Sequence, residues 1–208
     1  MTDHLYMYRY DDNIHDYVTK YTGSEPSWTS EDTKRAVLFS LVPGALSLCA
    51  ASSFSKEKNL IDWWLASNKP NWAPKNPAIY GVIDIATFAP LGCASYMAYK
   101  YGGGWFFFLI SLSLFLFWIE VALAFYGGSI ICAFLTMPLV KRRNYLCLFR
   151  NTLIMHLTGA GAAIAFFKIN QKAGLLMVPY VLWTGFYTFL TYSMSKTNTS
   201  EASERSTL

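Results

Sequence analysis

The sequence predicts an all-α membrane protein in which five transmembrane helices form one bundle. Its 208 residues are 53% hydrophobic and only 14% charged, which lies outside the usual range of soluble domains. Uncharged apolar runs close to the roughly 20 residues that cross a bilayer recur along most of the chain. The basic residues are gathered in short segments between these runs. The formal net charge of +4 therefore gives no indication of nucleic-acid binding.

Residues 1–34 are expected to form a polar, acidic N-terminal tail. Acidic residues outnumber basic ones there, and no apolar period is present, which is typical of a disordered segment. A secretory signal peptide needs a basic start and an apolar core, and a mitochondrial presequence avoids acids. Neither pattern fits this segment.

The first two predicted helices, about 35–54 and about 77–100, flank a proline-rich loop. The Pro43-Gly44 pair predicts a kink in the first helix, which bundle partners or water can accommodate. The loop is long enough to fold over one end of the bundle. It carries three aromatic residues suited to the headgroup level, Trp63, Trp64 and Trp72.

The third helix is predicted over about 105–137 and is expected to be kinked. This run is almost wholly apolar, and it is too long for one upright helix but too short for two crossings. The Gly127-Gly128 pair favours either a tilted helix kinked there or an interfacial segment followed by the span itself. Pro138 and the basic residues 141–143 mark its end.

The fourth and fifth helices are predicted over about 145–167 and about 174–194. The small residues of 158–163 are of the kind that lets helices approach closely in lipid. Residues 197–208 are predicted to be a polar, disordered C-terminal tail. Five spans place the two termini on opposite sides, and the Lys and Arg residues near the span ends favour a cytosolic C-terminus.

Two acidic residues, Asp84 and Glu120, fall inside apolar spans. A charge at membrane depth costs several kcal/mol unless it faces the bundle, pairs or becomes protonated. Both are therefore expected to point inward, with Arg150 or His156 as candidate partners. His156 by itself is most simply interpreted as a helix-packing histidine, since no other metal-binding side chain stands at ligand spacing on its span.

No motif in the sequence indicates catalysis, a metal or a cofactor. The four cysteines lie in or beside apolar runs without CxxC spacing, and we interpret them as small core residues. No GxSxG, HExxH, P-loop or dinucleotide fingerprint is present. The sequence therefore predicts a protein that is not an enzyme.

Four stretches of the chain are similar to the translocator protein family (TspO/MBR, the peripheral benzodiazepine receptors). The loop between the first two helices resembles the signature W-x4-6-KPxWxPP, except that Lys75 replaces its last proline. FSLVP at 39–43, the stretch 91–103 and the stretch 178–196 resemble further family motifs in the family's order. The resemblance covers about residues 35–196. The loop residues that match are Trp64, Lys69, Pro70, Trp72 and Pro74.

The resemblance implies a pocket for hydrophobic ligands such as cholesterol or porphyrin, capped by this loop. Its prolines would stiffen the loop into a lid from which Trp72 points inward. The alternative is an interfacial connector whose tryptophans only anchor the helix ends. The candidate ligand-binding residues are Trp72, Asp84, Phe88, Trp183, Phe186 and Tyr187.

The end of the fifth helix fits the L/V-x-Y-x-K/R pattern associated with cholesterol, in a place where the family carries it. Leu190, Tyr192 and Lys196 would then form an outer sterol contact. The ordinary explanation is an aromatic belt followed by a lysine whose amine reaches the headgroups.

The chain also departs from the family pattern. Asp84 stands where the family has a tryptophan, and residues 134–138 keep the proline but lack two further tryptophans. These losses, at positions 84, 135 and 137, argue against the porphyrin-degrading activity reported for some members. A ligand-free membrane scaffold or stress-response partner, dimerising through its small-residue helix faces, is the other alternative.

The expected partners are a sterol or tetrapyrrole ligand, the lipid bilayer and a second copy of the chain, without nucleic acid. A role in sterol or tetrapyrrole transport is implied by the family. If the source is a eukaryote, the resemblance implies the mitochondrial outer membrane.

Overall fold

The computed structural model describes residues 27–101 and 114–206, with the backbone alone for 114–119 and 199–206. The chain divides into two units, Met1–Thr33 and Lys34–Leu208, and the membrane helices belong to the second apart from residues 30–33, the first turn of the first helix. The helices in chain order are α2 (Ser30–Lys56), α3 (Lys58–Ala66), α4 (Pro77–Tyr101), α5 (Leu114–Lys141), α6 (Tyr145–Ile169) and α7 (Gln171–Ser206).

Five of the described helices, all except α3, are long and apolar enough to cross a membrane. No β-strand occurs in the described residues. The predicted fold class, an all-α protein with five transmembrane helices, is therefore confirmed. Many large apolar side chains in mid-helix remain exposed, as is expected where a helix faces lipid. Examples are Val42, Val82, Ile131, Leu157 and Leu182.

The start of α2 is fixed by a capping interaction. Asp32 accepts hydrogen bonds from the Thr29 backbone N–H (2.7 Å) and from the Thr29 hydroxyl (2.6 Å). The Thr29 hydroxyl in turn accepts from the Asp32 backbone N–H (3.2 Å). These reciprocal bonds satisfy donors that a helix N-terminus otherwise leaves without partners.

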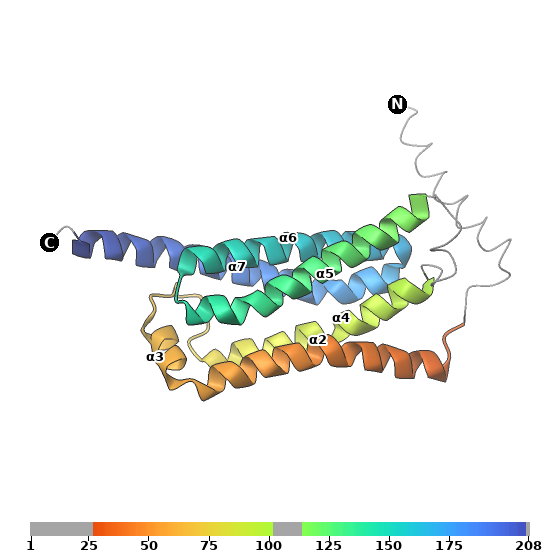
Figure 1. Cartoon of the computed structure of the whole chain (residues 1–208), viewed down its shortest axis with the longest axis horizontal. Helices are drawn as coiled ribbons and strands as arrows, with labels where there is room; N and C mark the ends of the chain where they lie inside the picture. Colours follow the sequence, from red (N-terminus) through yellow and green to blue (C-terminus); the bar gives the residue numbers. More distant parts are fainter. Residues whose placement is uncertain (1–26, 102–113, 207–208) are drawn as a thin grey trace, which may run out of the picture. The chain divides into compact units, whose positions relative to one another are not determined.

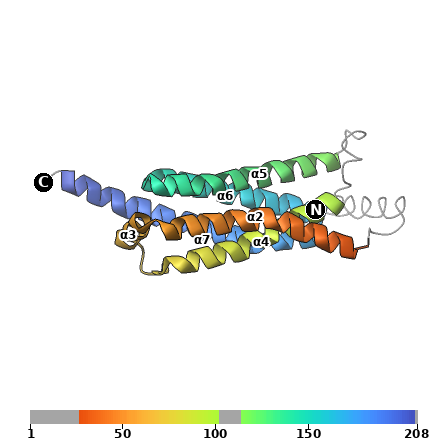
Figure 2. The same ribbon diagram turned by 60° about the horizontal axis from the view of Figure 1, so that its bottom comes forward.

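Successive long helices run in opposite directions, so α3 lies where α2 ends and α4 begins (Figures 1 and 2). The turn between α5 and α6 is at the same end. Trp63 of α3 stacks on Tyr145 at the start of α6, with ring centroids 5.3 Å apart. Arg143 in that turn donates a hydrogen bond to the Asn59 carbonyl (3.4 Å). The predicted loop thus contains a short helix that is tied across one end of the bundle.

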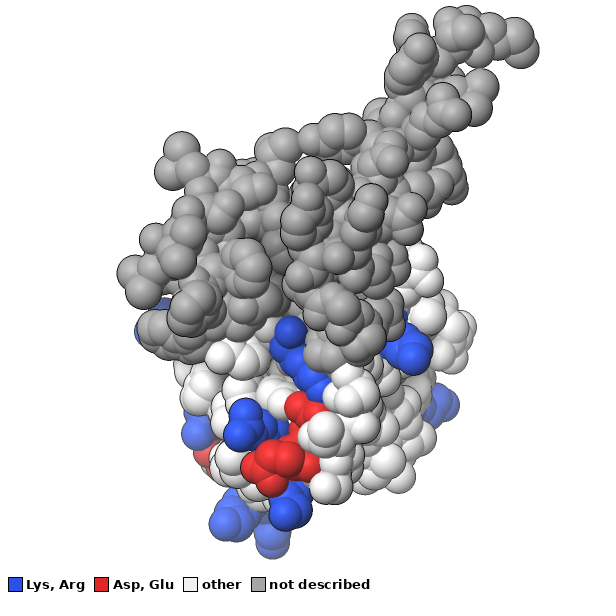
Figure 3. All heavy atoms as spheres, turned by 90° about the vertical axis from the view of Figure 1, so that its right-hand side faces the viewer, with Lys and Arg blue, Asp and Glu red and all other residues white. Residues whose placement is uncertain are grey.

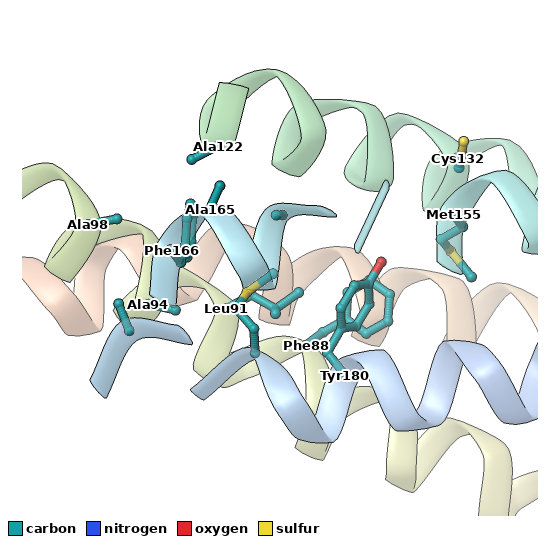
Figure 4. Close-up of a cluster of buried hydrophobic side chains, with 13 residues drawn as sticks. Phe88, Leu91, Ala94, Ala98, Ala122, Cys132, Met155, Ala165, Phe166 and Tyr180 are labelled. Carbon is teal, nitrogen blue, oxygen red and sulfur yellow. The ribbon is translucent and has the colours of Figure 1, made fainter. Parts of the chain in front are cut away.

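The core between the long helices combines small side chains, mostly alanines, with large ones in nearly equal proportion (Figure 4). Gly159 of α6 lies so close to Tyr180 of α7 that an added Cβ would be 2.8 Å from the ring. Ala162 and Ala165, one and two turns further along α6, are also buried. Residues 158–163 therefore allow the close helix approach that their composition predicts.

Hydrogen bonds between helices supplement this packing. Asn151 of α6 donates to the Cys132 carbonyl of α5 (2.9 Å). On the other side of α6, the hydroxyls of Thr152 and Thr191 are 2.8 Å apart, and Thr188 donates to the Thr152 carbonyl (3.0 Å). Such bonds contribute about 1 kcal/mol each in membrane bundles. They fix the rotation of α6 against both neighbours.

Two expectations differ from the structure. Residues 197–206, predicted as a disordered tail, continue α7 to Ser206, because nothing after Pro179 interrupts a helix that the bundle has already nucleated. α5 continues as one helix through Gly127-Gly128, and the kink expected there stays a prediction; residues 105–113 of its predicted range lie outside the described residues. Glu120, expected to point inward, is exposed; it lies in the second turn of α5, near the helix start at Leu114, where a long side chain can reach the headgroup region.

The charged residues are found mainly at the ends of the bundle. Figure 3 looks onto the end where α4 finishes and α7 begins, and its described part carries basic side chains with acidic side chains among them. This arrangement is the one expected where apolar spans end at the headgroups.

Candidate functional site

A cavity of about 650 Å³ lies between the helices at the end covered by α3. Its wall is mostly apolar, and every described helix contributes to it. The lining includes Ala50 and Phe54 of α2, Trp64 of α3, Tyr80, Val82, Asp84 and Phe88 of α4, Ala133 and Phe134 of α5, Met155 of α6, and Tyr187 of α7.

The cavity is not sealed from the surroundings of the bundle. Val82 and Phe134 line it, yet they are 67% and 61% exposed. Both belong to membrane-spanning helices, so the opening lies beside the lipid. Cys49, expected to be a core residue, is likewise exposed and lines the cavity.

Asp84 is held by two donors from α7. The Trp183 indole Nε1–H donates to Oδ1 (2.6 Å), and the Tyr187 hydroxyl donates to Oδ2 (3.0 Å). The expected partners, Arg150 and His156, do not bond to it: Arg150 is exposed, and His156 Nδ1 is 3.2 Å from the Thr184 hydroxyl. Asp84 therefore points inward as predicted, but neutral side chains hold it in the cavity wall.

Trp64 forms the part of the cavity wall that α3 contributes. It is only 7% exposed and packs edge-on against Tyr80, with ring centroids 5.4 Å apart, and against Phe54, at 6.4 Å. Leu60 stands four residues earlier on the same helix face and is also buried. The Trp64 Nε1–H is buried without a hydrogen-bond partner among the described residues.

Lys69, the lysine of the loop signature, caps α3. Its ammonium group donates to the Trp64 carbonyl and to the Ser67 carbonyl (3.2 Å), and lies 5.1 Å from the centre of the Trp64 ring. Carbonyl groups at a helix C-terminus lack helical partners and attract a cation. Partial burial lowers the pKa of Lys69 below its usual value. The lysine thus holds the end of α3, and Trp64 with it, over the cavity.

Trp72, expected to point inward, lies on the outside of α7. It is 47% exposed and stacks on Phe189, with ring centroids 5.3 Å apart, and meets Phe186 edge-on at 5.6 Å. These contacts fasten the loop to α7, and the neighbouring Pro74 carbonyl accepts a hydrogen bond from Tyr80 of α4 (2.9 Å). Trp72 is not part of the cavity wall.

The other candidate ligand-binding residues fall into two groups. Phe88, Asp84 and Tyr187 line the cavity. Trp183 and Phe186 do not line it but stack on each other at 4.8 Å. These two side chains support the wall from behind: Trp183 donates to Asp84, and Phe186 packs on Tyr80, with ring centroids 6.2 Å apart.

The three residues of the sterol pattern do not share one face of α7. Leu190 is fully buried, whereas Tyr192 is 47% exposed and Lys196 is exposed. Residues two positions apart on a helix point in nearly opposite directions, while residues four apart lie together. An outer contact can therefore use Tyr192 and Lys196 but not Leu190.

Trp64 and Tyr80 were not among the candidate ligand-binding residues. Trp64 belongs to the loop signature, but the signature does not show which of its two tryptophans turns inward. The signal that could have identified Trp64 is its spacing from Leu60, which gives α3 an apolar face.

No group of three His, Cys, Asp or Glu side chains in the described part of the chain could hold a metal ion.

Comparison with known proteins places this architecture among membrane proteins. A profile of the TspO/MBR family matches residues 36–196 of the chain. An uncharacterized membrane protein of Bacillus subtilis (strain 168), YtaB, is 26% identical to the chain over 143 residues, which make up 66% of this chain and 81% of YtaB. The family match includes every residue of the cavity wall.

Proposed function

The chain belongs to the TspO/MBR family, and from this premise we propose that it binds a sterol or a porphyrin in the cavity beneath α3. The observation that carries the proposal is the cavity itself. Its volume, about 650 Å³, lies within the roughly 300–1,000 Å³ typical of small-molecule sites. Its apolar wall suits a ligand that dissolves in the membrane.

Of the two ligand classes, the chemistry of the wall favours the sterol. A porphyrin brings carboxylate groups, and the described residues of the cavity wall include no Lys, Arg or His to pair with them. A sterol brings one hydroxyl group, which can donate a hydrogen bond to Asp84 in the wall. A porphyrin would have to keep its carboxylates outside the cavity.

Transport of sterol or tetrapyrrole, and a mitochondrial outer membrane location in a eukaryote, are extensions of this proposal. Transport requires that a bound ligand exchange with the membrane, and the opening beside Val82 and Phe134 offers a route. We propose binding without catalysis, because positions 84, 135 and 137 lack the tryptophans associated with porphyrin degradation in the family.

Filling the cavity is expected to abolish sterol binding. The purified protein is placed in phosphatidylcholine vesicles, and energy transfer from tryptophan to the fluorescent sterol dehydroergosterol is followed. Wild type should show saturable transfer. Ala133→Phe puts a ring into the wall and should weaken binding by about tenfold or more, because ligand and ring compete for one space.

Ala86→Phe is the matched control, since Ala86 is exposed on α4 and does not line the cavity. A second filling variant on another helix, Ala50→Phe, guards against a local packing defect at position 133. Circular dichroism and gel filtration check that each variant is folded. Absence of saturable transfer in wild type, or equal affinity in filled and unfilled proteins, contradicts sterol binding. A light-dependent product from protoporphyrin would indicate porphyrin-degrading activity in place of simple binding.

A further inference from the structure

We infer that the cavity selects lipophilic amines, binding the ammonium group of the ligand at Asp84. This inference rests on the proposed function, since it assigns a charge preference to the same cavity. It uses Asp84 in this chain, where the family pattern has a tryptophan.

The first support is the charge inventory of the wall. Asp84 is its one acidic residue, and no Lys, Arg or His lines the described cavity. A carboxylate in a low-dielectric site is strongly destabilised unless a counter-charge is present. The protein supplies none: no cation of the described residues pairs with Asp84. A cationic ligand would provide it.

The second support is the geometry of the two hydrogen bonds. Oδ1 accepts from Trp183 and Oδ2 from Tyr187, one donor to each oxygen. A carboxylate oxygen can accept two hydrogen bonds, so each oxygen keeps one acceptor site. The two bonds fix the carboxylate in one orientation. Because Asp84 is partly exposed and lines the cavity, a remaining acceptor site is open to a bound ligand.

The third support is the aromatic character of the wall around the carboxylate. Tyr187 touches Asp84 directly, and Tyr80 stacks on Tyr187 with ring centroids 6.0 Å apart. Both tyrosines and Trp64 line the cavity. The faces of such rings attract an ammonium group, and more strongly when it is desolvated. The remaining wall is apolar, so the body of the ligand should be a hydrocarbon or a ring system.

These features predict an order of affinity for ligands that have the same apolar skeleton and differ only in their polar group. An ammonium group gains an ion pair with Asp84, and a hydroxyl gains only a hydrogen bond. An anionic group is repelled and finds no partner. The order expected is therefore amine, then alcohol, then anion.

Three sterols with a common ring system test this order. We would compare 3β-aminocholest-5-ene, cholesterol and cholesteryl sulfate as competitors of dehydroergosterol, using the protein in dioleoylphosphatidylcholine vesicles at pH 7. In wild type the amine should displace the probe at an amount about tenfold lower than cholesterol requires, and the sulfate should be weakest.

Asp84→Asn should remove the advantage of the amine and bring it to within about threefold of cholesterol in the same competition, because an asparagine retains an acceptor for Trp183 but loses the charge. Asp62→Asn, the same substitution at an exposed site on α3, should retain the wild-type order. Asp84→Glu should restore part of the preference for the amine.

The outcomes separate this inference from the proposed function. Equal displacement by amine and alcohol in wild type, or an amine preference that survives Asp84→Asn, overturns the inference and leaves sterol binding intact. If dehydroergosterol itself does not bind, the proposed function fails and the inference fails with it.

Discussion

Replacing Gly92 with alanine is expected to lower the free energy of unfolding of the bundle by about 3 kcal/mol. A Cβ at this position of α4 would lie 2.2 Å from the Phe39 carbonyl oxygen and 2.3 Å from the Ser40 Cα of α2. Both are backbone atoms, which no side-chain rotation can move aside. α2 must therefore shift as a whole, and the contact of Phe39 with Tyr96, 5.5 Å between ring centroids, must change with it.

Gly127→Ala is the matched control on α5, where an added Cβ meets nothing within 4 Å. That variant should keep wild-type stability or gain up to about 1 kcal/mol, because alanine is the better helix former. Equilibrium unfolding with increasing sodium dodecyl sulfate in mixed micelles, followed by circular dichroism, measures both. Equal stability of the two variants would show that α2 does not pack as closely on α4 as the structure indicates.

Truncating Trp64 to alanine is expected to cost about 3 kcal/mol or more and to release bound sterol about tenfold faster. The side chain is almost fully buried among Phe54, Tyr80 and Trp63 and forms the wall that α3 contributes. Its loss leaves a hole and uncovers the end of the cavity. The rate is measured by stopped-flow transfer of dehydroergosterol to acceptor vesicles.

Trp72→Ala makes the comparison decisive, since both tryptophans belong to the loop signature. Trp72 is about half exposed, stacks on the outside of α7 and does not line the cavity, so its truncation should change the release rate less than about threefold. Faster sterol release from Trp72→Ala than from Trp64→Ala would mean that Trp72 covers the cavity, as the resemblance implies, and that Trp64 does not.

The five long helices could be predicted because each is an apolar run of membrane length, a property that is local in sequence. The helical continuation of α7 could not, since residues 197–206 are polar and their order depends on a helix already nucleated in the bundle. α3 was missed for a related reason. Its nine residues are too few to be stable alone, and their order comes from contacts such as that of Trp63 with Tyr145.

Residues of the site could be predicted from sequence only where a single residue was unusual in its surroundings. Asp84 stood out as an acid in an apolar run. Its partners Trp183 and Tyr187 lie 99 and 103 residues away, and only the rotation of α7 against α4 brings them together. The prediction that Leu190 forms an outer sterol contact was wrong for a different reason. The sterol pattern takes no account of helical periodicity, and Leu190 is buried.

The opening of the cavity beside Val82 and Phe134 determines how affinity for this protein must be expressed. A hydrophobic ligand reaches such an opening from the hydrocarbon interior, after it has already partitioned out of water. Diluting the protein into more phospholipid should therefore empty the cavity even when the total ligand per volume of buffer is held constant. Binding constants for this chain should be expressed as mole ratios of ligand to lipid in the bilayer. Each constant should be given together with the lipid-to-protein ratio at which it was measured.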